Sequence, residues 1–151
     1  MTSDFEWVAE VEEDVPIRFQ TAEELKAFFA ELEQTESGHL VIYKDCGLFR
    51  PHWWERLLGR SGWDRRVCFI LDWRGSYARL DFLDKRGSVY TALDHEQPVD
   101  TPEEIRFQLS GGEPTPAPPE ECMQKARAFA AAGEFIDTGM RPEWLSYRYV
   151  R

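Results

Sequence analysis

Histidines, which are common acid–base groups and metal ligands, are few in this sequence and widely spaced. The three histidines, His39, His52 and His95, contain no pair at the i, i+4 spacing that brings two imidazoles to one face of a helix. We therefore expect structural or solvent-facing roles for them. Three carboxylates in strand-like segments could pair as acid and base, although outward-facing strand and turn positions explain them more simply: Asp72, Asp81 and Asp84.

The cysteines predict buried thiols. Cys46, Cys68 and Cys122 are odd in number and include no C-x-x-C pair, a usage that fits a reducing cytosol. Cys68 and Cys122 lie in apolar patterns, and a Cys–His nucleophile would need the fold to bring a thiol to a histidine. The sequence contains no Gly-rich phosphate loop, no H-x-E with a later C-x-x-C, and no G-x-S-x-G. We predict no catalytic residue, metal or cofactor.

The charge balance favours a basic partner. Acidic side chains number 28 and basic ones 18, so the net charge is -10 and the isoelectric point is near 4.8. Direct binding to nucleic acid is disfavoured because phosphate would be repelled, although the same charge could serve solubility alone. The chain shows no basic-then-apolar leader and no run near the roughly 20 apolar residues that span a bilayer. We expect a cytoplasmic protein without membrane association.

Two segments are candidate binding surfaces. Trp53 and Trp54 are adjacent, so both cannot point into one core. An exposed Trp is a common hot spot at protein interfaces. A loop Trp folded onto the domain is an equally good interpretation. The loop over residues 94–104 is rich in carboxylates and could meet a basic cleft, or it could be a solvated loop with a capping turn at Thr101. Its candidate contact residues are Asp94, Glu96, Asp100, Glu103 and Glu104.

Several elements must position these residues. Thr21 to Glu24 has capping-box form and precedes a helical apolar stripe through about Gln34. Strands are predicted over residues 5–15, 39–43, 66–73, 77–83, 88–92 and 105–109, and the short loops between residues 66 and 92 imply antiparallel hairpins. Residues 44–64 give a weak signal, with helical turns possible over residues 51–59, and residues 111–119 predict a connector.

The C-terminal stretch predicts a helix, a turn and a strand. Pro118 and Pro119 suit a first helical turn, and apolar residues then recur at spacings of three and four up to Gly133, which can end the helix. Gly139 supplies a turn, and Pro142 turns the chain toward an extended strand over residues 145–149. We predict one α+β domain over residues 1–151, in which a mostly antiparallel sheet of about five to seven strands packs against two main helices.

This stretch also resembles a known family. A helix of the form Ala-x-x-Phe, a Thr-Gly-x-Arg-Pro segment and a following aromatic residue resemble the C-terminal signature of a large family of bacterial immunity proteins from polymorphic toxin systems, often paired with nucleobase deaminase toxins. The matching residues, to which we assign structural roles, are Ala126, Phe129, Thr138, Gly139, Arg141, Pro142 and, at the aromatic position, Tyr147.

The resemblance implies a binding protein without enzymatic activity. It would neutralise a cognate toxin in a 1:1 complex as a monomer, and its carboxylates would stand opposite the cations of the toxin's substrate cleft. The alternative is a small cytosolic enzyme or ligand-binding protein whose site is built from scattered carboxylates and aromatic residues.

Overall fold

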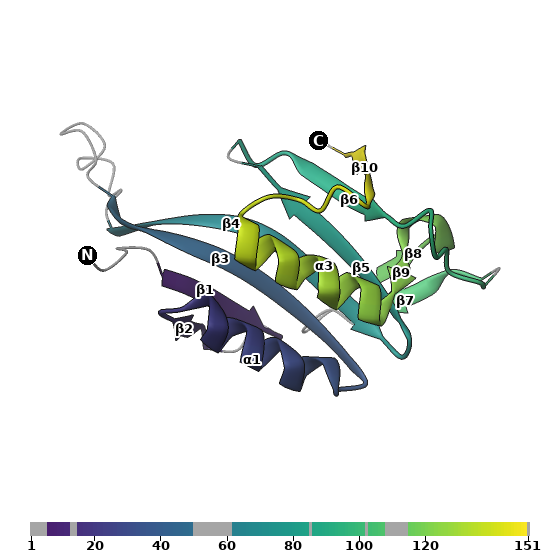
Figure 1. Cartoon of the computed structure of the whole chain (residues 1–151), viewed down its shortest axis with the longest axis horizontal. Helices are drawn as coiled ribbons and strands as arrows, with labels where there is room; N and C mark the ends of the chain where they lie inside the picture. The colour runs from purple at the N-terminus through teal and green to yellow at the C-terminus, as the bar shows by residue number, and fades with distance from the viewer. Residues whose placement is uncertain are drawn as a thin grey trace.

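A large antiparallel sheet is the framework of the chain (Figure 1). The computed structural model describes residues 6–12, 15–49, 62–84, 86–101, 103–107 and 115–150. The strands follow the order β10-β6-β5-β4-β3-β1-β2, and the short β9 pairs with β5 beside this path. Their bounds are β1 Glu6–Val11, β2 Ile17–Phe19, β3 Ser37–Phe49, β4 Gly62–Arg74, β5 Tyr77–Leu83, β6 Val89–Leu93, β9 Met123–Gln124 and β10 Ser146–Tyr149.

Two α-helices of the described residues, α1 (Ala22–Glu33) and α3 (Lys125–Thr138), lie side by side across one face of the sheet (Figure 1). Every strand pairing in the large sheet is antiparallel. The predicted α+β class, with a mostly antiparallel sheet packed against two helices, is therefore confirmed.

Helix α1 begins as its sequence predicts. The Thr21 hydroxyl accepts a hydrogen bond from the Glu24 backbone N–H at 3.2 Å, and the Glu24 carboxylate accepts one from the Gln20 N–H. Leu25 and Phe29 of the predicted apolar stripe are buried against the sheet. The local capping residues thus determine where this helix begins, and the spacing of its apolar residues determines which face is buried.

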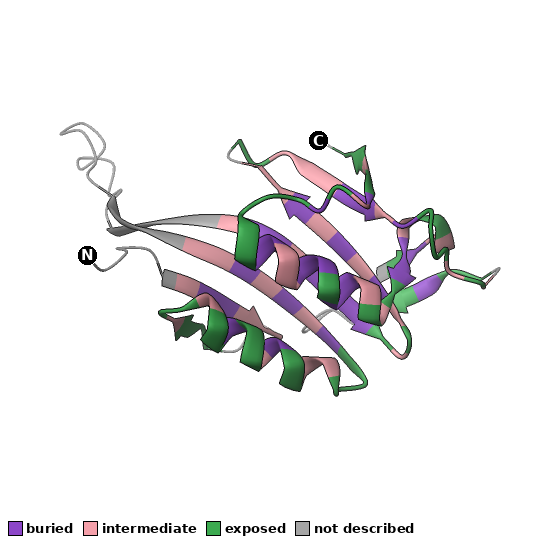
Figure 2. Ribbon diagram, in the orientation of Figure 1, coloured by how far each residue is buried: buried purple, intermediate pink, exposed green. Residues whose placement is uncertain are grey.

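Aromatic rings join the two helices to the sheet within a core that also contains Leu, Ile, Met and Ala side chains. Phe29 and Phe129, one from each helix, meet edge to face with centroids 6.0 Å apart. The Phe129 ring also lies 5.3 Å from Trp73 of β4, while Phe135 lies 5.7 Å from Phe69. Edge-to-face packing is a favoured geometry for buried rings. Figure 2 shows buried positions alternating with exposed ones along both helices.

The C-terminal helix starts later than predicted. Pro119 begins only a 3-10 turn, η1 (Pro119–Glu121), after which the chain extends through Cys122. Met123 and Gln124 form β9, in which Met123 pairs with Ala78 of β5, so Met123 enters the core from a strand. The helix begins at Lys125. Backbone pairing with β5 outweighs the helical start signal of the two prolines, and the predicted start was wrong.

Helix α3 also ends later than predicted. It passes through Gly133 and ends with Thr138, followed by Gly139 in the left-handed conformation at φ +73°. The Gly139 N–H donates to the Phe135 carbonyl at 2.7 Å, which closes the last turn. A residue without a Cβ suits this position, whereas Gly133 sits between buried turns that hold the helix together.

The remaining segments extend or add to the predicted strands. β3 and β4 form one long hairpin that continues to Phe49 and resumes at Gly62, well into the region of weak signal. β7 (Ile105–Phe107) pairs with β8 (Thr115–Ala117) in a small second sheet, so part of the predicted connector is a strand. The helical turns predicted over residues 51–59 lie outside the described residues.

Candidate functional site

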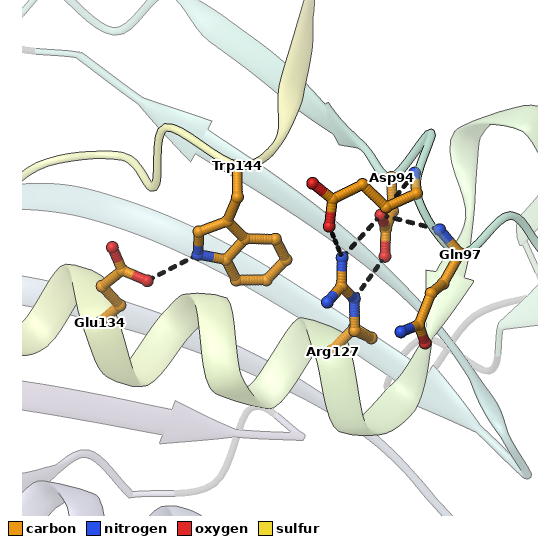
Figure 3. A network of polar contacts seen from close by, with 6 residues as sticks. Asp94, Gln97, Arg127, Glu134 and Trp144 are labelled. Carbon is orange, nitrogen blue, oxygen red and sulfur yellow. Dashed lines mark hydrogen bonds and ion pairs between the residues drawn. The ribbon is translucent and has the colours of Figure 1, made fainter.

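A buried carboxylate, Asp94, anchors the start of the acidic loop that follows β6 (Figure 3). Its side chain is 0% exposed and accepts hydrogen bonds from Arg127 Nε at 2.7 Å and Nη2 at 3.0 Å. The backbone N–H groups of Glu96 and Gln97 also donate to it, each at 3.2 Å. We predicted Asp94 on the binding surface, but the structure places it beneath the loop. A buried charge needs hydrogen-bond partners, and Arg127 and the two backbone N–H groups supply them.

The electrostatics of Asp94 reflect these contacts. Burial alone would raise the pKa of the Asp94 carboxyl, but hydrogen bonds from Arg127 and from the Gln97 N–H lower it below its usual value. The carboxylate is therefore charged at neutral pH and fixes the loop to α3.

Arg127 and Trp144 extend this network along α3. The Arg127 guanidinium stacks 4.4 Å from the centroid of the Trp144 ring and also reaches the Glu96 carboxylate at 3.0 Å. The Trp144 indole N–H donates to Glu134 at 2.7 Å. Figure 3 shows Arg127 and Glu134 rising from the same helix toward Asp94 and Trp144. Sequence reasoning missed Arg127 and Glu134, although their i, i+7 spacing places them on one side of a helix.

The other carboxylates of the loop face solvent. Glu96, Asp100, Glu103 and Glu104 are exposed, and Glu96 keeps 63% of its side chain accessible while it contacts Arg127. Within the described residues, Asp100, Glu103 and Glu104 form no ion pair. The Thr101 hydroxyl accepts from the Glu103 N–H at 3.4 Å, so the local turn at Thr101 closes one residue before the Glu104 N–H that the capping-box form predicts. The loop is therefore anchored where it begins, at Asp94, and carries accessible negative charge further along.

The two candidate interface tryptophans are not part of this cluster as the structure describes it. Trp53 and Trp54 lie outside the described residues, in the segment between β3 and β4. Their role in binding stays a prediction.

The first half of the C-terminal signature builds and closes α3. Phe129 is 5% exposed and occupies the core between the helices and β4. The Thr138 hydroxyl donates to the Glu134 carbonyl at 3.0 Å and accepts from the Met140 N–H at 3.1 Å, on either side of the left-handed Gly139. These residues fix where the helix stops and where the chain turns.

The second half of the signature ties the chain to the sheet edge. The Arg141 guanidinium lies over the rings of Tyr90 and Tyr147, at 4.2 and 4.7 Å from their centroids. The Tyr147 hydroxyl donates to the carbonyl of the buried Pro142 at 2.6 Å. Burial raises the pKa of Tyr147 to about 12, although the nearby Arg141 acts in the opposite direction. The signature residues from Phe129 to Tyr147 thus have structural contacts within the chain, whereas Ala126 is exposed on α3.

The three strand carboxylates have separate partners. Asp72 contacts the His39 ring, and Asp81 accepts a hydrogen bond from the Thr91 hydroxyl at 2.7 Å. Asp84 instead accepts two backbone N–H groups of the β5–β6 turn, which lower its pKa. Burial raises the pKa of Asp81. Asp72 and Asp81 share the sheet face opposite the helices, whereas Asp84 acts as a turn residue.

The described thiols are buried, as predicted. Cys68 is 2% and Cys122 3% exposed, and burial raises the pKa of Cys122 to about 12, which leaves it protonated and unreactive at neutral pH. Across the part of the chain that the structure describes, no three His, Cys, Asp or Glu side chains gather as metal ligands would. None of the described helices has the length and apolar character needed to cross a membrane.

Comparison with known proteins gives one family. The family model described as Immunity protein Imm1 matches residues 13–148, a span that includes α1, the acidic loop and the C-terminal signature. Comparison with curated proteins gives no significant match.

Proposed function

The chain belongs to the Imm1 family of immunity proteins, and we propose that it neutralises its cognate toxin by covering the toxin's active site or substrate path. Neutralisation of a toxin is the function that family membership implies, and the match over residues 13–148 is the observation that carries the proposal. We further propose that the toxin acts on nucleic acid, with a nucleobase deaminase as the leading candidate.

The charge of the chain supports this choice of toxin. A net charge of -10 favours association with the Lys and Arg that a nucleic-acid-acting toxin needs for phosphate. Opposite charges also raise the rate of encounter, so binding can be fast and the substrate excluded. The inhibitor needs no catalysis of its own, and family membership favours a binding protein over an enzyme.

The acidic loop is the first surface that we propose for contact. Glu96, Asp100, Glu103 and Glu104 are exposed on it, and the pairing of Asp94 with Arg127 holds its base against α3. A loop held by a rigid scaffold presents charge with little ordering cost on binding. Asp94 supports this surface from beneath, by positioning the loop.

Trp53 and Trp54 are the second proposed contact. A Trp buried at the centre of an interface is a common hot spot, and a single one can contribute more than about 2 kcal/mol to affinity. In this proposal the charged loop sets the encounter rate and a Trp anchors the complex.

We infer that the chain acts as a monomer in a 1:1 complex in the cytoplasm, without a cofactor and without direct contact to nucleic acid or membrane. The acidic composition and the cysteine usage support this setting.

Co-expression with the toxin encoded by the adjacent gene tests the function. Cells should survive when both are produced, and calorimetry should show a 1:1 complex. Death of the co-expressing cells together with no heat of binding would refute the immunity function.

A charge-matched pair of variants tests the loop. Glu103→Gln with Glu104→Gln should lower the association rate constant and reduce its salt dependence. Glu10→Gln with Glu143→Gln removes the same charge outside the loop and is the control. Equal association rates for the two double variants would show that the loop does not steer binding.

A further inference from the structure

A groove of about 490 Å³ lies between α1 and α3 on the outer side of the helical layer. Its lining includes small residues that leave the space between the helices open: the exposed Ala30 of α1, the exposed Ala126 and Ala130 of α3, and the half-buried Gly133. Phe29 and Phe129 lie deeper in it. An ion pair of 2.7 Å between Lys26 and Asp137 joins the two helices where α1 begins and α3 ends.

Gly133 is the unexpected residue of this groove. Glycine is second only to proline as the worst residue for a helix interior, and an alanine here would favour the helix. Gly133 has no positive φ, and a Cβ placed on it would have no atom within 4 Å. Neither backbone geometry nor packing within the described structure therefore requires glycine, whereas close approach of another molecule to the helix would.

The charges around the groove select the partner. Glu33 lines it and forms no ion pair among the described residues, while Lys26 is already paired with Asp137. The outward side of α1 and the loop after it carry further exposed carboxylates, at Glu23, Glu31 and Glu36. A second copy of this chain or a nucleic acid would bring like charge to this face, whereas a basic protein segment would be attracted.

We propose that this groove is the docking site for a basic, amphipathic segment of the toxin, with an apolar side chain over the small-residue floor and a Lys or Arg beside Glu33. The proposal rests on the immunity function proposed above and adds an apolar anchor to it. Glu134 lines the groove and also bonds Trp144 on the other side of α3, so the groove and the acidic loop flank the same helix. A toxin bound across α3 contacts both.

Filling the groove tests the proposal. Gly133→Leu places a side chain in the open space, and Ala130→Leu does the same one turn earlier. Both should weaken the calorimetric affinity for the catalytic domain of the toxin encoded by the adjacent gene by about tenfold or more. Ala27→Leu adds a leucine to the exposed side of α1 outside the groove and is the matched control. Melting temperatures should stay at or above that of the parent for Gly133→Leu.

The outcomes separate this proposal from the function on which it rests. Parent-like affinity of both groove variants, with the parent complex intact, would overturn the docking site and leave the immunity function standing. Absence of binding by the parent would overturn both. Self-association of the free parent that Gly133→Leu abolishes would assign the groove to a second copy of the chain and overturn docking of the toxin.

Discussion

The Tyr147 hydroxyl donates a 2.6 Å hydrogen bond to the carbonyl of Pro142, so edge strand β10 is fastened to the segment that leaves α3. β10 lies at the end of the sheet and pairs with β6 alone along the strand order. The Tyr147 ring also packs against Phe82 of the core at 5.9 Å. One side chain therefore joins the strand, the turn after α3 and the sheet.

We expect Tyr147→Phe to destabilise the fold by about 1 kcal/mol. The ring packing would remain, while the Pro142 carbonyl would lose its donor. Urea denaturation followed by circular dichroism measures the change. Tyr149→Phe is the control, since Tyr149 is 63% exposed and its hydroxyl has water available. Equal losses in the two variants would mean that the bond to Pro142 has no effect on stability.

Stability should also fall in alkaline solution because of Tyr147. Burial raises its pKa to about 12 in the folded chain, from the ordinary value near 10. The folded state thus holds this proton more tightly, and its contribution to stability is complete below about pH 10 and is lost as pH rises toward 12. Urea midpoints across this range should fall less steeply for Tyr147→Phe. An unchanged slope would exclude Tyr147 as the source.

Asp94→Asn should weaken the fold by roughly 2 kcal/mol. Removing one charge of a buried pair leaves its partner poorly compensated, but the Arg127 side chain keeps 23% exposure, which reduces the cost below that of a fully buried pair. Because the folded pKa of Asp94 is lowered, its contribution is present above about pH 4 and is lost as the pH falls further. The variant should therefore show a flatter acid limb in denaturation measured against pH. An unchanged acid limb would contradict this account.

The two glycines of the α3 region should respond in opposite directions to alanine. Gly139→Ala should cost about 1 kcal/mol, because φ is +73° and a Cβ is strained there. Gly133→Ala should add roughly 0.5–1 kcal/mol, because it replaces glycine within a helix without new contacts. Thermal melts of the two variants compare them directly. A shift in the same direction for both would contradict the assigned backbone conformations.

Phe129→Ala should destabilise the fold by roughly 3–5 kcal/mol. The ring is 5% exposed and packs against Phe29 and Trp73, so truncation removes buried area and leaves a cavity. Chemical denaturation measures the loss. Phe28→Ala, at a half-buried position on α1, should cost less and serves as the control. A parent-like melt of Phe129→Ala would mean that α3 is not held on the sheet by this ring.

Local signals in the sequence predicted much of the fold. Thr21 capped α1 as expected, and the hairpins from β4 to β6 followed from short loops, because capping and tight turns depend on neighbouring residues. The start of α3 was not predictable in this way. Pro119 carries a helical signal, but the pairing of Met123 with Ala78 joins residues far apart in the sequence.

In the candidate site too, features set by neighbouring residues were predictable and those set by distant residues were not. The exposure of Asp100, Glu103 and Glu104 matched their polar, loop-like context. The burial of Asp94 did not, because its partner Arg127 comes from α3, 33 residues away. The groove could not be foreseen either, since it arises where α1 and α3 pass each other.

The engagement of the signature residues within the chain has a consequence for specificity. Thr138, Gly139, Pro142 and Tyr147 act by ending a helix and seating an edge strand. Substitution at these positions should therefore disturb folding first, whereas the exposed carboxylates Glu103 and Glu104 can change with little effect on the fold. Two chains that share the motif need not neutralise the same toxin, because the motif leaves such exposed positions free to differ.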